Sequence, residues 1–236
     1  MTRPVSLALM AQSIASHLRL LTDQGILGFD CSPETLEILA RGLAHNSLST
    51  HGPLAQAQTE ASSCTECALH KNREVGVFAQ GDSKAEVMFV GLAPGREEAR
   101  VGLPFQGEVG ELLDNIIKAM GLNRESVYMC NLVKCPVADG QAPDPTCIRA
   151  CSRFFKKQVE EVRPRIICAL GQTVAESILK QELPFSRARG KFQPYLGMRV
   201  MPTHHPVELL VSPEKKRAVW QDMQAIMRVL DLQGSS

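Results

Sequence analysis

The segment EVMFVGLAPG, residues 86–95, joins a short apolar run to a turn that contains two glycines. Three further apolar runs of β character follow it, so that candidate strands span residues 86–90, 127–133, 165–170 and 199–201. Stretches with helical spacing of apolar residues lie between and after them, at 108–120, 145–162, 172–180 and 213–230. Strands that alternate with helices form a parallel sheet with helices on both faces. We therefore predict an α/β fold.

The overall composition excludes several classes of protein. Of the 236 residues, 44% are hydrophobic and 22% are charged, which is close to an average globular protein and supplies enough apolar sequence for a core. This excludes collagens, coiled coils and disordered tails. No apolar run approaches the ~20 residues of a membrane helix, and the N-terminus lacks the pattern of a secretory signal. We expect a cytoplasmic protein with no membrane partner.

The first 60 residues differ from the rest. Helical spacing over residues 5–22 and a Ser-Pro helix start at residue 32 predict two short helices. Residues 44–63 are polar and show no periodicity, which predicts a linker. We therefore predict a helical extension and linker over residues 1–60 and a main domain over 61–236. The extension could pack on the main domain or bind a protein partner.

The eight cysteines favour a metal or cluster site over disulfides, because no secretory segment is visible. Cys64 and Cys67 form a C-x-x-C pair, and Cys135 and Cys151 could complete four thiolate ligands. Cys147, one helical turn before Cys151, is a rival ligand. Spacing alone leaves zinc and an iron–sulfur cluster open. The remaining cysteines are expected to be buried small hydrophobic residues: Cys31, Cys130 and Cys168.

Glycines and polar residues gather where the predicted strands end, and this is the edge at which open α/β sheets bind ligands. Gly91 and Gly95 follow the first strand, Asn131 lies near the end of the second, and His205 follows the fourth. Phe105, in a Pro-Phe-Gln-Gly segment, could stack on a base. Each residue also has an ordinary structural explanation: a turn, an amide bonded to backbone, a structural histidine or a core aromatic ring.

Charge is distributed unevenly along the chain. Residues 149–217 carry 14 Lys and Arg against 6 Asp and Glu, whereas residues 1–148 carry 11 against 17. This asymmetry favours a polyanion as the partner of the C-terminal half. Solvated basic helix faces are the alternative explanation.

Taken together and in order, these motifs resemble the family 4 uracil-DNA glycosylases, the iron–sulfur members of the uracil-DNA glycosylase superfamily. The similarity runs from about Cys64 to Leu230. It is carried by CTECALHK at 64–71, GLAPGREE at 91–98, GLPFQGEVGELLD at 102–114, NLVKC at 131–135, AC at 150–151, RPRIICALG at 163–171 and PTHHP at 202–206.

The resemblance implies a three-layer α/β/α domain with a four-stranded parallel sheet. It implies a structural [4Fe–4S] cluster on Cys64, Cys67, Cys135 and Cys151, and leaves Cys147 out. The implied reaction is hydrolysis of the N-glycosidic bond of deoxyuridine in DNA, which leaves an abasic site for base-excision repair. The expected partner is uracil-containing DNA, bound by a monomer.

Roles in the implied reaction carry over to residues of this chain. A glycosylase takes its base out of the DNA stack into a pocket. There Phe105 would stack on uracil, and Asn131 would bond its Watson–Crick edge. His205 would donate to uracil O2, where negative charge develops. Glu98 would position or activate the water.

Further contacts are implied around the pocket. Backbone amides of Gly91, Leu92 and Ala93 would hold the other side of the uracil ring. Residues 207–217 are expected to form a loop that enters the DNA, with phosphate contacts from Lys215, Lys216 and Arg217.

Two positions depart from the family pattern. Leu92 stands where the family usually has glutamate, and the Leu210-Val211 pair lacks the arginine that often follows the family's Leu-Leu. Ala93 agrees with the family. Leu92 supports a second hypothesis, a catalytically weak, non-catalytic or covalent-trapping relative that binds uracil or single-stranded DNA. A third is a C-x-x-C zinc protein with another ligand at the same edge of the sheet.

Overall fold

The computed structural model describes residues 52–138, 141–182 and 184–231. The chain divides into two units, Met1–Arg41 and Gly42–Ser236, and every described residue belongs to the second unit. The helices predicted at residues 5–22 and from residue 32, together with Cys31, lie outside the described residues. Within the described ranges, no helix is both long and apolar enough to cross a membrane.

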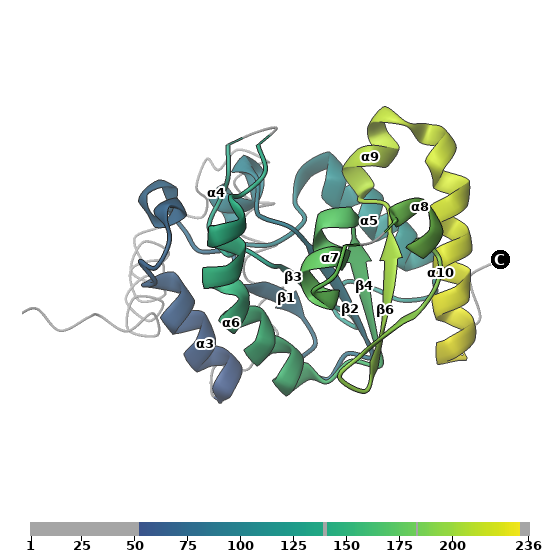
Figure 1. The fold of residues 1–236 in the computed structure, drawn as a ribbon, viewed down its shortest axis with the longest axis horizontal. Coiled ribbons are helices and arrows are strands. Elements are labelled where there is room, and N and C mark those ends of the chain that lie inside the picture. Colours follow the sequence, from purple (N-terminus) through teal and green to yellow (C-terminus); the bar gives the residue numbers. More distant parts are fainter. Residues whose placement is uncertain (1–51, 139–140, 183, 232–236) are drawn as a thin grey trace, which may run out of the picture. The chain divides into compact units, whose positions relative to one another are not determined.

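The described residues contain one six-stranded sheet in the order β1-β3-β2-β4-β6-β5 (Figure 1). Its strands are β1 Ala79–Gly81, β2 Val87–Gly91, β3 Tyr128–Asn131, β4 Ile166–Leu170, β5 Gln193–Tyr195 and β6 Met198–Thr203. The four predicted strands correspond to β2, β3, β4 and β6, and neighbours among them are parallel. Each edge adds an antiparallel strand, β1 or β5. These edge strands have three residues each, which is too short for a recognisable pattern.

The parallel strands are apolar on both faces because helices cover both sides of the sheet. Successive side chains of a strand point to opposite faces. In β2, Met88 and Val90 therefore belong to one core, whereas Val87 and Phe89 belong to the other. All four are at most 1% exposed.

Helices form the outer two layers. They are α3 Pro53–Ser62, α4 Arg96–Val101, α5 Gly107–Ala119, α6 Pro145–Val162, α7 Gln172–Leu179, α8 Phe185–Ala188, α9 Pro206–Val211 and α10 Lys216–Leu230, with 3₁₀ turns η1 Ala68–Asn72 and η2 Pro213–Lys215. Buried side chains of α3, α6 and α7 pack in one core, and those of α5, α9 and α10 pack in the other. The three-layer α/β/α prediction is confirmed.

The prediction of an unstructured linker over residues 44–63 is wrong for its last half, where α3 forms. Pro53 occupies the first turn, in which a missing N–H costs nothing. Leu54, Ala57 and Ala61 are buried one above another, and the helix packs on α6. The small size of the two alanines hid this helical spacing in the sequence.

The loop that the family resemblance implied over residues 207–217 is not found, because this segment is helical. It contains most of α9, all of η2 and the start of α10. His205 caps α9, and Glu208 Oε1 accepts a hydrogen bond from the His205 N–H at 3.1 Å. This reciprocal capping and the prolines at helix starts explain why a helix forms there.

The carboxyl ends of the parallel strands meet at one edge of the sheet, as predicted. Gly91 of β2 stands opposite Asn131 of β3, and Leu170 of β4 stands opposite Thr203 of β6. From β2 the chain adds β3 on one side, and then adds β4 and β6 on the other side, so the order of the strands reverses between β2 and β4. A crevice outside such a reversal point is where open α/β sheets bind ligands.

Candidate active site

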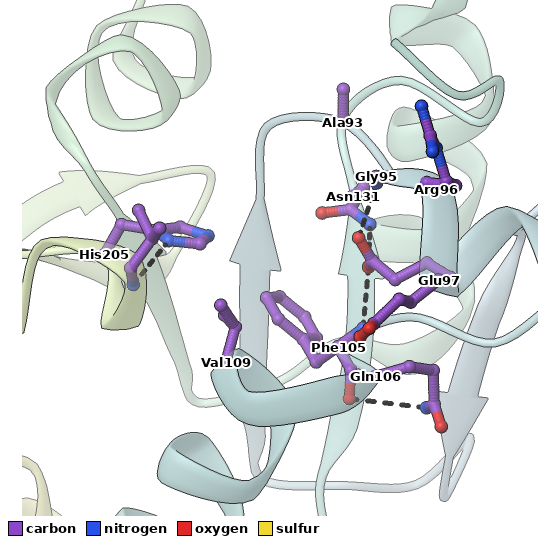
Figure 2. Close-up of a pocket in the computed structure, with 11 residues that line it drawn as sticks. Ala93, Gly95, Arg96, Glu97, Phe105, Gln106, Val109, Asn131 and His205 are labelled. Carbon is purple, nitrogen blue, oxygen red and sulfur yellow. Dashed lines mark hydrogen bonds between the residues drawn. The ribbon is translucent and has the colours of Figure 1, made fainter. Parts of the chain in front are cut away.

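A cavity of about 420 Å³ lies at this edge (Figure 2). Five predicted site residues line it, namely Ala93, Glu98, Phe105, Asn131 and His205. The other lining residues are Gly95, Arg96, Glu97, Gln106, Val109 and Val207. The turn after β2, helix α4, the start of α5, the end of β3 and the start of α9 therefore contribute to one site.

Glu98 ties three parts of this cavity together. Its Oε1 accepts hydrogen bonds from the Phe105 N–H at 2.7 Å and from Asn131 Nδ2 at 3.1 Å. Its Oε2 accepts from the Gly95 N–H at 2.7 Å. Burial raises the pKa of the Glu98 carboxyl, and these three donors oppose the shift. Each carboxylate oxygen of Glu98 thus accepts from at least one neighbouring N–H group.

The Asn131 amide has a fixed orientation as a result. Its nitrogen faces Glu98, and Figure 2 shows its oxygen turned toward the side of the cavity where His205 lies. Asn131 itself is only 2% exposed. A ligand in the cavity would therefore meet a hydrogen-bond acceptor, Asn131 Oδ1, at this position.

Phe105 presents its ring to the same space while its backbone adopts an unusual conformation. Its φ is +53°, in the left-handed region that bulky residues rarely occupy. The ring centroid lies 6.3 Å from that of His205. Gly91 lies behind the Phe105 ring and the Asn131 amide: a side chain there would overlap with Asn131 Oδ1 and approach Phe105 Cζ to 3.0 Å. The glycine leaves the space that the ring and the amide occupy.

His205 carries its proton on a defined nitrogen. Its Nδ1 accepts a hydrogen bond from the Val207 N–H at 3.2 Å, so the proton of the neutral ring lies on Nε2. Burial lowers the pKa of His205 to about 4, against a smaller opposing effect of Glu208. The ring is therefore a neutral donor at neutral pH.

The four predicted thiol ligands lie in one region, away from this cavity. Burial raises the pKa of Cys151 to about 11, and the neighbouring Cys135 and Cys67 thiols add to the shift. Burial likewise raises the pKa of Cys135, with contributions from Cys67 and Cys64. Cys147 also contacts Cys67, so the rival ligand lies at the edge of the same group.

Two arginines donate to these thiols. Arg73 Nη1 lies 3.3 Å from Cys135 Sγ and 2.8 Å from the Cys64 carbonyl oxygen. Arg153 Nη2 lies 3.4 Å from Cys64 Sγ. The Arg73 donor opposes the burial that raises the pKa of Cys135, and the thiolate is the form that binds metals. Of the three cysteines expected to be buried hydrophobic residues, the two described ones, Cys130 and Cys168, are fully buried in the cores, as predicted.

Residues 78–224 match the family model of the uracil DNA glycosylase superfamily. The chain belongs to this superfamily. A type-4 uracil-DNA glycosylase of Thermotoga maritima is 36% identical over 175 residues, which cover 72% of this chain and 91% of the relative. One of Saccharolobus solfataricus is 36% identical over 180 residues, covering 72% and 83%. A type-5 enzyme of Pyrobaculum aerophilum is 30% identical over 151 residues, covering 56% and 66%.

In this uracil DNA glycosylase superfamily member, Leu92 does not contribute to the 420 Å³ cavity. It lines an adjoining cavity of about 330 Å³, which shares Ala93, His205 and Val207 with the first. Leu92 also packs against the core beneath α6 and α7. The departure from the family pattern therefore lies beside the site rather than within it.

The predicted DNA-binding residues of this superfamily member fall into two groups. Lys216 and Arg217 are exposed at the start of α10. Lys215 is half-buried, and its Nζ lies 2.8 Å from Glu208 Oε2. Val211 is 82% exposed at the end of α9.

Sequence analysis missed two residues that hold the site in place. Lys134 is 1% exposed, and its Nζ donates to the Asn131 carbonyl and to Gln158 Oε1 at 2.7 Å. Arg124 contacts the backbone of the Phe105 segment. Lysine and arginine are mostly exposed, so neither residue gave a signal in the sequence.

Proposed function

We propose that this protein hydrolyses the N-glycosidic bond between uracil and deoxyribose in DNA and leaves an abasic site for base-excision repair. One observation carries the proposal: an aromatic ring, a side-chain amide of fixed orientation and a neutral imidazole meet at a single cavity. The named activity of the type-4 relatives supports the same substrate.

The amide supplies base selectivity. The flipped uracil would stack on the ring of Phe105. Because Asn131 Nδ2 is bonded to Glu98, Asn131 Oδ1 is the atom that meets the base. It would accept the N3–H of uracil, whereas cytosine has an unprotonated N3 and would leave two acceptors facing each other. A site built around such a bond rejects the wrong base strongly.

The imidazole stabilises the leaving group. As the glycosidic bond breaks, negative charge develops on the departing uracil. The His205 Nε2–H would donate to uracil O2, and its benefit is greatest in the transition state. The lowered pKa keeps His205 neutral, so it donates a hydrogen bond without carrying a charge in the resting enzyme.

Glu98 acts through its neighbours in this scheme. Three N–H donors occupy its carboxylate, so we assign it the positioning of Phe105 and Asn131. Leu92 lines the adjoining cavity and not the one that Phe105 and Asn131 line. That placement supports catalysis over a binding-only role.

We also propose that Cys64, Cys67, Cys135 and Cys151 hold a [4Fe–4S] cluster. The four thiols lie together beside two arginine donors, a donor set that suits such a cluster. Among the described residues, no three Cys, His, Asp or Glu side chains are placed to bind a single metal ion. When bound, the cluster would supply a rigid cross-link between the 64–67 segment, the end of β3 and α6.

DNA would approach the edge of the sheet that carries α9 and the start of α10. Lys216 and Arg217 are exposed cations there, and we assign them to phosphates. Lys215 already pairs with Glu208, so its share of phosphate binding is smaller.

The test is excision from a labelled oligonucleotide that contains one uracil, read by alkaline cleavage of the abasic product. Cleavage at uracil, absent from cytosine and thymine oligonucleotides, is expected. Asn131→Ala and His205→Ala should each slow excision by about 100-fold or more. His204→Ala is the matched control, because His204 contacts Glu208 and Phe185 instead of the cavity. A wild-type protein that forms no abasic product would refute the proposal.

A further inference from the structure

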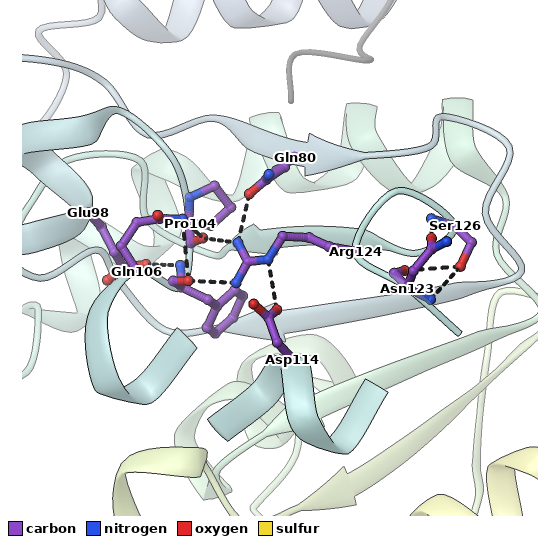
Figure 3. A network of polar contacts seen from close by, with 9 residues as sticks. Gln80, Glu98, Pro104, Gln106, Asp114, Asn123, Arg124 and Ser126 are labelled. Carbon is purple, nitrogen blue, oxygen red and sulfur yellow. Dashed lines mark hydrogen bonds and ion pairs between the residues drawn. The ribbon is translucent and has the colours of Figure 1, made fainter. Parts of the chain in front are cut away.

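The Arg124 side chain joins three separate parts of the chain, one of which carries the cavity-lining Phe105 (Figure 3). Its Nε lies 2.7 Å from Asp114 Oδ1 on α5, and its Nη1 lies 2.8 Å from Gln80 Oε1 on β1. The other two contacts are to consecutive carbonyls: Nη1 to Pro104 O at 3.2 Å and Nη2 to Phe105 O at 2.8 Å. The Arg124 side chain is 13% exposed, so these bonds form largely out of water.

The backbone that carries Arg124 is itself held in a tight turn. Ser126 Oγ accepts from the Asn123 N–H at 3.0 Å, and Asn123 Oδ1 accepts from the Ser126 N–H at 2.8 Å. Reciprocal bonds of this kind fix a turn. The guanidinium therefore starts from a defined position, and its planar fork offers donors in fixed directions.

Phe105 needs such support because of its backbone. A non-glycine residue at φ +53° persists only where its surroundings hold it. Glu98 holds the Phe105 N–H and Arg124 holds the Phe105 carbonyl, so the peptide units on both sides of the ring are fixed. A side chain at position 110 of α5 would overlap with the Phe105 carbonyl. Gly110 therefore allows the helix to lie close to that carbonyl.

We propose that Arg124 is a positioning residue for the uracil-stacking ring of Phe105. The inference rests on the proposed function, in which the ring stacks on the flipped base. Arg124 fixes the direction of the ring by holding the Pro104 and Phe105 carbonyls, while Asp114 balances its charge. Lysine could keep the charge near Asp114, but its single ammonium lacks the fork that reaches both carbonyls and Gln80 together.

The experiment compares Arg124→Lys and Arg124→Met in single-turnover excision at saturating enzyme. Each variant should excise uracil about 10- to 100-fold more slowly, the range of a lost base-stacking contact. In a Phe105→Ala background the same substitutions should slow excision further by less than about threefold, because the ring that they misplace is absent. Arg124→Lys serves as the milder variant should Arg124→Met unfold.

Arg165→Met is the matched control. Arg165 also joins a carboxylate and a carbonyl, at 2.9 Å from both Glu86 Oε1 and Val229 O, and it does not line the cavity. Its loss should leave excision unchanged in both backgrounds. A second readout needs no DNA: hydrogen exchange of the Phe105 N–H should speed up at least about tenfold in Arg124→Lys and stay unchanged in Arg165→Met.

The outcomes separate the two claims. A folded Arg124→Lys with wild-type excision and exchange overturns the positioning role alone. Equal losses with and without the Phe105 ring also overturn it, because they would indicate a purely structural role. A wild-type protein that releases no uracil overturns the proposed function, and the exchange measurement then still reports whether Arg124 holds Phe105.

Discussion

Substituting Gly91 by alanine tests the geometry of the cavity with a single methyl group. That methyl group would overlap with Asn131 Oδ1 and lie 3.0 Å from Phe105 Cζ, whereas ordinary van der Waals contact begins at 3.4 Å. The amide oxygen must therefore retreat by about 1 Å, and a displacement of this size costs on the order of 100-fold in rate. The overpacking itself should destabilise the fold by about 1–3 kcal/mol.

The assay is single-turnover uracil excision by Gly91→Ala, with thermal unfolding measured on the same protein. Gly76→Ala is the control, since a methyl group there would meet nothing closer than 3.6 Å. We expect Gly91→Ala to stay folded at the assay temperature and to lose most of its rate, and Gly76→Ala to keep it. A wild-type rate in folded Gly91→Ala would show that the amide and the ring do not act from the positions described.

Three other predictions concern proton binding, the cluster and DNA. Excision should slow as pH falls through the raised pKa of Glu98, because a protonated carboxyl cannot accept all three N–H donors; His205, with a pKa of about 4, stays neutral until lower pH, and Glu98→Gln should remove this acid limb of the pH–rate profile. The effect of Glu98 on stability has the opposite sign. Because its pKa in the folded protein is raised above 4.5, protonated Glu98 contributes stability that is fully present below pH 4.5 and is lost as pH rises through the raised pKa. The difference in melting temperature between the wild type and Glu98→Gln should therefore change between pH 4.5 and the raised pKa. Cys135→Ser should abolish the visible absorption and the bound iron of the purified protein and lower its melting temperature, and unchanged iron content would remove Cys135 from the ligands. Alanine at both Lys216 and Arg217 should weaken DNA binding and flatten the log–log salt dependence by about 2, whereas an unchanged slope would show that neither contacts a phosphate.

Much of the core architecture follows from local patterns. Helix α6 begins at Pro145 and ends at Val162 as predicted, because Asp144 caps its start and its buried face repeats clearly. The four parallel strands are long enough to show continuous apolar runs. The edge strands and helices α3 and α9 escaped prediction because short strands, buried alanines and capping bonds leave weak marks in a sequence.

The candidate site shows the same division. Asn131 and His205 were expected to meet because the carboxyl ends of parallel strands share an edge, the family resemblance added Phe105, and the cavity contains all three. Their chemical roles depend on details that the sequence does not show. The acceptor role of Asn131 comes from its bond to Glu98, and the proton on His205 Nε2 follows from the Val207 N–H.

The sequence by itself determined the α/β class, the alternation of the parallel strands with helices along the chain and the residue types gathered at one edge of the sheet. These depend on apolar periodicity and strand direction, which are local properties. Only the tertiary structure decided how Arg124 and Lys134 are used. Both are charged residues whose burial depends on acceptors far away in the chain, such as Gln80 for Arg124 and Gln158 for Lys134. Burial of a charge requires such partners, and no local pattern records where folding will place them.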